Sequence, residues 1–349
     1  MNVFFVIYSF YVFFCCKTAI ATLCSELTFG VALTTIPPRF ASVFNTINSW
    51  TNQSCPPFAL LIFVPKKYRR FRPHNRNATH SKETLRSFAV RLREQLSEQI
   101  AHGRIYVVET ERDYGPILKY AGLFDFVQNN KMHNLASVDY WIIGDDDVRY
   151  RTTVVEAYYD SLISLQHNAW ASNRSIVASD VSGLALAYAV DDSTFASVMT
   201  HYRHDIRLTI LSSQSTIASH ESQDPSFRQG LVSQSITHVQ GVDTIMISTQ
   251  LIKSLRVFNT DLLDAFLTWI FNWCPDSFYQ DDYIISLLLH IAGISIVSLW
   301  DGLSVAGHID GVSKYHNQLH TNNNVFIREY ITQQCIVENY KLIQEFLLS

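Results

Sequence analysis

Residues 27–65 read LTFGVALTTIPPRFASVFNTINSWTNQSCPPFALLIFVP, and this stretch decides the fold class. It opens with an apolar run of strand character that ends in a turn at Pro37 and Pro38, and it closes with a second such run at 58–65. Between the two runs, apolar residues recur at helical spacing: Phe40, Val43, Phe44, Ile47 and Trp50. A strand, a helix and a strand in this order predict a β-α-β unit with parallel strands.

The same alternation continues to residue 150. Strand character is found at 103–110 and 138–144, and helical character at 81–100 and 116–130. Strands that alternate with helices predict an α/β fold, in which an open, twisted and mostly parallel sheet is flanked by helices.

Beyond residue 150 the pattern is less regular. The segments 175–188 and 241–252 have strand character, whereas 324–348 has a helical pattern. Residues 281–300 predict a helix that ends near Gly293 and is followed by a strand. The stretch 200–240 is rich in Ser, Thr, Gln and His, which predicts a long and partly irregular loop.

The composition is that of a globular protein. Of the 349 residues, 48% are hydrophobic and 17% are charged. The formal net charge of −4 at pH 7 argues against a strongly basic nucleic-acid-binding protein, so no nucleic-acid partner is expected. An anionic ligand would need a local cationic site or a metal ion.

The N-terminal segment has the character of a targeting sequence. An apolar run extends from Val3 to Cys16 and is followed by Lys17, and Ala19 and Ala21 form an A-x-A pattern. The run is shorter than the roughly 20 residues of a membrane span. It predicts a signal peptide at 1–21, with an uncleaved signal anchor or a buried element as alternatives.

Two further features agree with entry into the secretory pathway. Three N-x-S/T acceptor sequons occur, at Asn52, Asn77 and Asn173. After cleavage, the remaining cysteines would be Cys24, Cys55, Cys274 and Cys335. Four cysteines in an oxidising compartment permit two disulfides, with three possible pairings. We therefore expect a luminal or secreted protein, with membrane attachment if the N-terminal segment stays in place.

Three consecutive aspartates, Asp145 to Asp147, follow the predicted strand 138–144. Ligands of open α/β sheets bind beyond the carboxyl ends of the strands, so the aspartates lie where such a fold places its chemistry. Neighbouring carboxylates raise one another's pKa values, so a cation is expected there unless the segment is a solvated turn. Mg²⁺ and Mn²⁺ prefer such oxygen ligands.

Four segments together resemble the GT-A-type glycosyltransferases, and in particular the family 2-like enzymes, which use nucleotide-sugar donors. They are TTIPPRF (34–40), RDYGPILK (112–119), IIGDDDVRY (142–150) and FYQDDYIISLLLHIAGI (278–294). They occur in the expected order, and the resemblance spans roughly residues 28–310. It implies a single domain at 22–349, with a nucleotide-binding half at 22–150 and an acceptor-binding half at 151–349.

The resemblance also implies the residues that bind the donor. Those expected to contact a UDP- or GDP-type nucleotide sugar are Thr34, Thr35, Pro37, Arg39, Asp113, Tyr114, Gly115, Lys119, Asp145 and Asp146. Mn²⁺ or Mg²⁺ would be held by Asp147 and Asp145, with His308 as a late ligand and His316 and His320 as weaker rivals. A structural role for His308, and a capped turn at RDYGP, are the alternatives.

The acidic segment at 281–282 is expected to supply the general base. Asp282 is preferred, although other members often have Glu-Asp where this chain has Asp281 and Asp282. Helix capping is the alternative role for either residue. Gly241 and Asp243 lie in a segment similar to one that lines the acceptor.

The resemblance thus implies an inverting, metal-dependent glycosyltransferase that modifies a hydroxyl group of a glycan, protein or lipid. The alternatives are a retaining transferase and a non-catalytic glycan- or nucleotide-binding protein on the same scaffold.

Overall fold

The structure is a computed structural model. It describes residues 27–68, 82–129, 135–166, 175–178, 244–279, 281–298, 306–308, 335–336 and 339–348. The predicted signal segment, the sequons at Asn77 and Asn173, the loop 200–240 and the acceptor residues Gly241 and Asp243 lie outside these residues.

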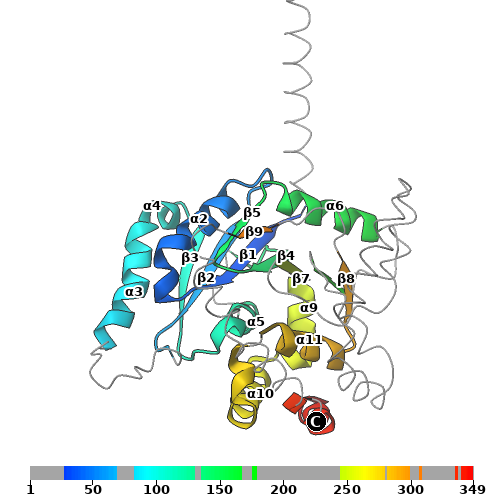
Figure 1. The fold of residues 1–349 in the computed structure, drawn as a ribbon. Helices are drawn as coiled ribbons and strands as arrows, with labels where there is room; N and C mark the ends of the chain where they lie inside the picture. The colour runs from blue at the N-terminus through cyan, green and yellow to red at the C-terminus, as the bar shows by residue number, and fades with distance from the viewer. Residues whose placement is uncertain are drawn as a thin grey trace, which may run out of the picture.

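A central sheet of seven strands runs through the described part of the chain, in the order β3-β2-β1-β4-β7-β6-β8 (Figure 1). Its strands are β1 (Phe29–Thr34), β2 (Ala59–Pro65), β3 (Ile105–Thr110), β4 (Tyr140–Gly144), β6 (Ser175–Ala178), β7 (Thr244–Ser248) and β8 (Ser295–Ser298). Strands β1 to β4 are mutually parallel, and β6 pairs with β8 in parallel. Strand β7 is antiparallel to both of its neighbours. The predicted α/β fold with a mostly parallel sheet is thereby confirmed.

Helices cover both faces of the sheet (Figure 1). On one face lie α2 (Phe40–Thr51), α3 (Lys82–Gln95), α4 (Ser97–Ala101) and α6 (Val154–Gln166). On the other face lie α5 (Leu118–Gln128), α9 (Thr249–Ser254), α10 (Thr260–Trp273) and α11 (Asp281–Ile291). Short 3-10 turns connect several of these elements: η1 (Pro37–Arg39), η2 (Gly115–Ile117), η5 (Arg256–Phe258) and η6 (Pro275–Tyr279).

Strand β2 carries apolar side chains on both faces of the sheet, and helices cover both faces. Leu61 and Phe63 point into the core beside α5, whereas Leu60, Ile62 and Val64 point into the core beside α2. Every residue of β2 is buried. A strand that is apolar on both faces reads as a continuous hydrophobic run, because helices cover it on both sides.

Some boundaries differ from those predicted. The segment 81–100 forms two helices, α3 and α4, instead of one. The predicted strand 241–252 ends at Ser248, because the Ser248 hydroxyl accepts a hydrogen bond from the Leu251 amide at 3.0 Å and caps α9. Helix α10, which the sequence pattern left unassigned, begins at a similar cap: Asn259 accepts from the amides of Asp261 and Leu262.

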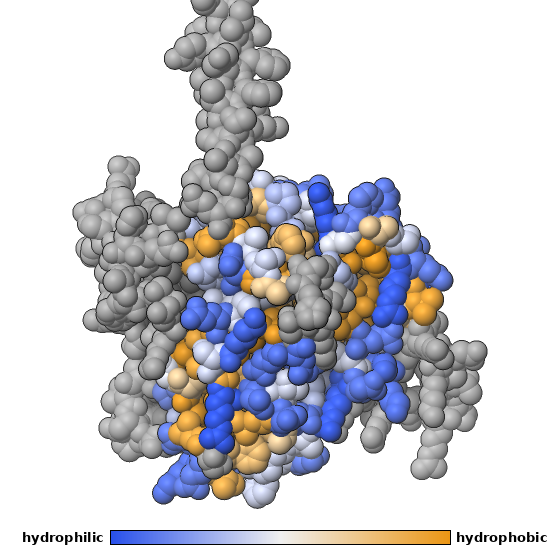
Figure 2. Space-filling view, turned by 180° about the vertical axis from the view of Figure 1, so that it is seen from behind, coloured by the Kyte–Doolittle hydropathy of each residue, from blue (hydrophilic) through white to orange (hydrophobic). Residues whose placement is uncertain are grey.

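One disulfide joins Cys274, at the end of α10, to Cys335. Cys55 is also disulfide-bonded. Among the residues that the structure describes, no helix is long and apolar enough to cross a membrane. On the rear surface, apolar residues form several separate groups among hydrophilic ones (Figure 2).

Candidate functional site

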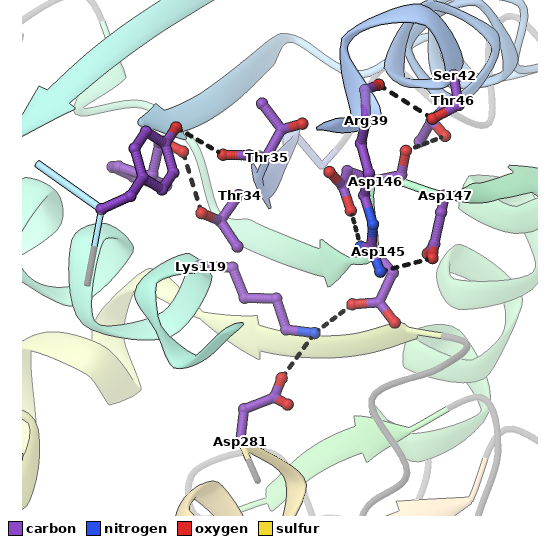
Figure 3. A network of polar contacts seen from close by, with 12 residues as sticks. Thr34, Thr35, Arg39, Ser42, Thr46, Lys119, Asp145, Asp146, Asp147 and Asp281 are labelled. Carbon is purple, nitrogen blue, oxygen red and sulfur yellow. Dashed lines mark hydrogen bonds and ion pairs between the residues drawn. The ribbon is translucent and has the colours of Figure 1, made fainter. Parts of the chain in front are cut away.

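The strand order places the three aspartates at the point where the sheet topology reverses. Strand β1 lies between β2 and β4 and is parallel to both. The segments that follow β1 and β4 therefore leave the sheet at the same edge. Crevices at such switch points are the usual ligand sites of open α/β sheets. Arg39 follows β1 and Asp145 to Asp147 follow β4, and these side chains converge there (Figure 3).

Arg39 holds two of the aspartates. Its Nη1 donates a short hydrogen bond to Asp146 Oδ1, and its Nη2 lies 2.9 Å from Asp147 Oδ2. Both carboxylates are buried, whereas the Arg39 side chain retains 25% of its exposure. One planar guanidinium therefore bridges two adjacent carboxylates, and its several N–H donors suit it to this role.

Lys119 holds the third aspartate together with a residue from a distant element. Its Nζ donates to Asp145 Oδ1 at 2.5 Å and lies 2.9 Å from Asp281 Oδ2. Lys119 belongs to α5 and Asp281 opens α11, so a single ammonium joins three elements (Figure 3). The Lys119 side chain is only 2% exposed.

The electrostatics of the site follow from this crowding. Burial raises the pKa of Asp145 to about 7, Lys119 counteracts that rise, and the neighbouring carboxylates of Asp147 and Asp281 add to it. Burial also raises the pKa of Asp146, against the opposing effect of Arg39. The site thus carries crowded carboxylates that a further cation would stabilise.

The two site cations stay charged. Burial alone would lower the pKa of Lys119, but Asp145 and Asp281 outweigh that effect and raise the pKa well above its ordinary value. Burial likewise opposes the charge of Arg39, and the adjacent aspartates again prevail and raise its pKa.

Tyr150 fixes the backbone of the acidic segment. Its hydroxyl accepts a hydrogen bond from the Asp145 amide at 2.8 Å, and its ring packs on Trp50 with 4.3 Å between centroids. Gly144 leaves room for this contact, because a Cβ atom there would lie 2.6 Å from the Tyr150 hydroxyl oxygen. On the other side, the Thr46 hydroxyl donates to the backbone carbonyl of Asp146 at 2.9 Å.

The end of β1 forms the wall next to Arg39. Thr34 donates through its hydroxyl to the Phe63 carbonyl at 3.1 Å, and the Thr35 carbonyl accepts from Tyr68 at 3.1 Å. Within the described residues, Thr35 Oγ1 and Asp146 Oδ2 are buried and make no hydrogen bond within 3.5 Å. The Thr35 hydroxyl is nevertheless near enough to lower the pKa of Asp146, against the larger effect of burial. Pro37, at the start of η1, is the remaining residue predicted here.

The RDYG segment lies between β3 and α5. Asp113 is buried, and its Oδ1 accepts from the Gly115 amide at 2.8 Å. Gly115 adopts a positive φ of 68°, which favours glycine. Asp264, on α10, accepts hydrogen bonds from Arg112 at 2.6 Å and from the Tyr114 hydroxyl. The RDYG segment therefore forms a turn, which the hydrogen bond within it and the contacts with Asp264 on α10 hold in place.

Two further predicted residues, Asp282 and His308, lie among those that the structure describes. Asp282 is half-buried beside Asp281 at the start of α11, and its charge contributes to the raised pKa of Lys119 after the larger effects of burial and of the closer aspartates. His308 ends β9 (Ala306–His308), which pairs with β5 (Val148–Tyr150) so that the His308 backbone lies opposite Val148. Because Val148 follows Asp147 in the chain, the His308 backbone pairs with the immediate neighbour of Asp147.

The donor set fits a divalent cation of the Mg²⁺ or Mn²⁺ type in part. Four carboxylates, those of Asp145, Asp146, Asp147 and Asp281, face two cations, which leaves a formal excess of two negative charges. In the described residues, no three His, Cys, Asp or Glu side chains form a complete ligand group. Mg²⁺ commonly takes one or two carboxylates and completes its shell with water and substrate phosphates, so an incomplete protein set is compatible with it.

Several residues that build the site were not predicted from the sequence. Thr46, Tyr68, Tyr150 and Asp264 support the predicted residues through hydrogen bonds. Of these four residues, only Tyr150 lies within one of the four motif segments, at the end of IIGDDDVRY (142–150). Nothing in the spacing of the other three distinguishes them from ordinary core or surface residues.

No protein-family model matches the chain, and a comparison with curated proteins finds no significant match.

Proposed function

We propose that the protein is a metal-dependent glycosyltransferase of the GT-A type, which transfers a sugar from a nucleotide-diphosphate sugar to a hydroxyl group of a glycan, protein or lipid. The observation that carries the proposal is the contact of Lys119 with both Asp145 and Asp281. It brings the acidic segment after β4, suited to a metal and a diphosphate, together with the acidic start of α11. These are the two groups of acids that such a transfer requires.

On the donor side, Asp145 and Asp147 are the residues that would hold Mn²⁺ or Mg²⁺. When bound, such an ion takes up negative charge on a departing diphosphate. Arg39 is the cation best placed to bind the diphosphate as well, because it is the more exposed of the two site cations. Asp113 and the end of β1 would position the nucleoside.

On the acceptor side, the acids at the start of α11 would remove a proton. A carboxylate takes the proton of the acceptor hydroxyl while its oxygen forms the bond to the anomeric carbon. The bond from that carbon to the diphosphate oxygen breaks, and the nucleotide leaves with the electron pair. In-line displacement inverts the anomeric centre. We assign Asp282 as the base and Asp281 as the neighbour that Lys119 holds.

The secretory lumen is the compartment proposed for this activity. The apolar N-terminal segment and the sequons support it, and the Cys274–Cys335 disulfide agrees with it weakly.

The first test is calorimetric binding of UDP and of GDP to the full-length protein, each with and without Mn²⁺. We expect metal-dependent binding of one nucleotide. The Asp147→Ala variant should lose it, whereas Asp261→Ala, which removes an exposed carboxylate at the start of α10, should retain it.

Failure of both nucleotides to bind under every condition would refute the proposal for UDP- and GDP-type donors. Binding without sugar transfer to any hydroxyl acceptor would instead favour the non-catalytic alternative. The anomeric configuration of a transferred sugar, read by NMR, separates an inverting from a retaining enzyme.

A further inference from the structure

The Arg39 guanidinium stands where it competes with a metal ion. Its Nη2 lies 2.9 Å from Asp147 Oδ2, and its Nη1 bonds Asp146. Asp147 is one of the two aspartates proposed to bind a divalent cation. An ion that approached this oxygen would meet the positive charge of Arg39 at close range in a poorly solvated site, where like charges repel strongly.

The site nevertheless has unused capacity to bind a ligand. Asp146 Oδ2 and Thr35 Oγ1 are buried and, among the described residues, have no hydrogen-bond partner within 3.5 Å, although the Thr35 hydroxyl lies near enough to Asp146 to lower its pKa. The four carboxylates also exceed the two cations by two formal charges. Buried polar atoms without partners are uncommon, and they mark a place where a bound group adds contacts.

Arg39 and Lys119 differ in their freedom to leave the carboxylates. The Lys119 side chain is enclosed, at 2% exposure, and two elements hold it. Arg39 projects from the three-residue turn η1, and its side chain is 25% exposed. A guanidinium has five N–H donors, so Arg39 has donors to spare for a second anion.

We propose that Arg39 is an internal counter-ion that holds the metal-binding carboxylates until a nucleotide diphosphate draws it away, so that the metal ion binds well only with the nucleotide. The inference rests on the proposed function. The diphosphate offers the planar guanidinium a multiply charged partner whose oxygens can accept two of its N–H groups at once. The release of Asp147 then opens the oxygen that the metal needs. Nucleotide and metal are therefore coupled, and by linkage each strengthens the binding of the other.

The test is Mn²⁺ binding to the full-length protein, measured by electron paramagnetic resonance without nucleotide and then with UDP and with GDP. We expect Arg39→Gln to bind Mn²⁺ without nucleotide on the order of tenfold more tightly than the wild type. The same variant should bind the nucleotide more weakly, and the enhancement of Mn²⁺ affinity by nucleotide should largely disappear. Arg39→Lys keeps the positive charge but loses the contact of two guanidinium nitrogens with Asp146 and Asp147. Its Mn²⁺ affinity should therefore lie between that of the wild type and that of Arg39→Gln.

The matched control is Arg149→Gln. Arg149 is exposed on β5, two residues after Asp147, so this variant removes the same charge nearby. Its Mn²⁺ affinity should stay within about twofold of the wild type, because exposed charges are screened. Circular dichroism checks that each variant is folded.

Equal or weaker Mn²⁺ binding by folded Arg39→Gln would overturn the inference, as would an equal gain in Arg149→Gln. If Arg39→Gln does not fold, an unchanged Mn²⁺ affinity in Arg39→Lys would overturn it. The proposed function fails separately, when the wild type binds neither nucleotide with Mn²⁺. The Mn²⁺ measurement without nucleotide does not depend on that result, so the two failures are distinguishable.

Discussion

The ammonium of Lys119 lies 2.9 Å from the carboxylate of Asp281, although 162 residues separate them in the chain, from 119 to 281. The contact ties helix α5 to the first turn of α11. Because Lys119 also bonds Asp145, a single buried charge fixes the distance between the acids after β4 and the acids of α11. One buried side chain thus bridges the two groups of acids.

Replacing Lys119 by Met should destabilise the protein by about 3 kcal/mol. The change leaves Asp145 and Asp281 buried or half-buried without their shared cation, and removal of one partner from a buried ion pair is costly. Lys66→Met is the matched control, because the pair of Lys66 with Glu111 is exposed and should contribute less than about 1 kcal/mol. Urea unfolding measures both, and similar losses in the two variants would contradict the prediction.

The stability of the metal-free protein should fall as the pH rises from about 4 to about 7. Burial raises the pKa of Asp145 from 3.8 to about 7, so in that window the folded state binds a proton that the unfolded state has lost. The contribution levels off only once the pH has passed through the folded pKa, above about pH 8. Because the Asp145 side chain retains 28% exposure, we expect a fall of about 2 kcal/mol, less than the full shift implies.

The measurement for this pH effect is chemical denaturation across the window in the presence of a chelator. The difference in stability between the wild type and Asp145→Asn should change with pH. A stability difference for Asp145→Asn that does not change between pH 4 and pH 7 would show that the carboxylate titrates normally.

Tyr150→Phe should lower stability by about 1 kcal/mol, because it leaves the Asp145 amide without its acceptor. Tyr106→Phe removes an exposed hydrogen bond to Gly103 and should change stability by less. If the proposed function holds, Tyr150→Phe should also weaken Mn²⁺–nucleotide binding, because the acidic segment loses its anchor. An unchanged unfolding midpoint and unchanged binding would argue that Trp50 packing and the Thr46 hydrogen bond fix the segment without the Tyr150 hydroxyl.

Asp264→Ala should loosen the RDYG turn without unfolding the protein. Arg112 and Tyr114 lose their shared acceptor on α10, so the amides of Tyr114 and Gly115 should exchange hydrogen several-fold faster. Asp261→Ala, one turn earlier on the same helix, is the control and should leave their exchange unchanged. The prediction fails if both variants exchange alike.

Much of the site could be predicted from the first half of the sequence. Each strand of that half is a continuous apolar run followed by polar residues, so its carboxyl end is visible in the pattern. Parallel strands put these ends at one edge of the sheet, so the pattern alone places Asp145 at the edge where such folds bind ligands. Arg39 and Asp113 were expected there from the family resemblance. Local periodicity suffices where each element is defined by its own residues.

The second half was predicted less well, for a physical reason. Helix α10 is apolar on one face, but its role depends on Asp264 meeting a loop about 150 residues earlier in the chain. Strand β7 ends at Ser248 because a serine cap begins a helix there, whereas the apolar residues continue to Ile252. Such choices between strand and helix are made by capping and packing, which hydrophobicity alone does not encode.

The sequence by itself determined the α/β class, the parallel strands of the first half and the position of the acids at the strand ends, because these follow from local periodicity and chain direction. Only the tertiary structure decided which cation meets which carboxylate. Nothing in the spacing of Arg39, Lys119 and Asp281 tells that one arginine bridges Asp146 and Asp147 while one lysine joins Asp145 to α11. Those pairings arise because the packing of helices on the sheet removes much of the water around these charges, so that a buried charge is stabilised by a partner within the protein.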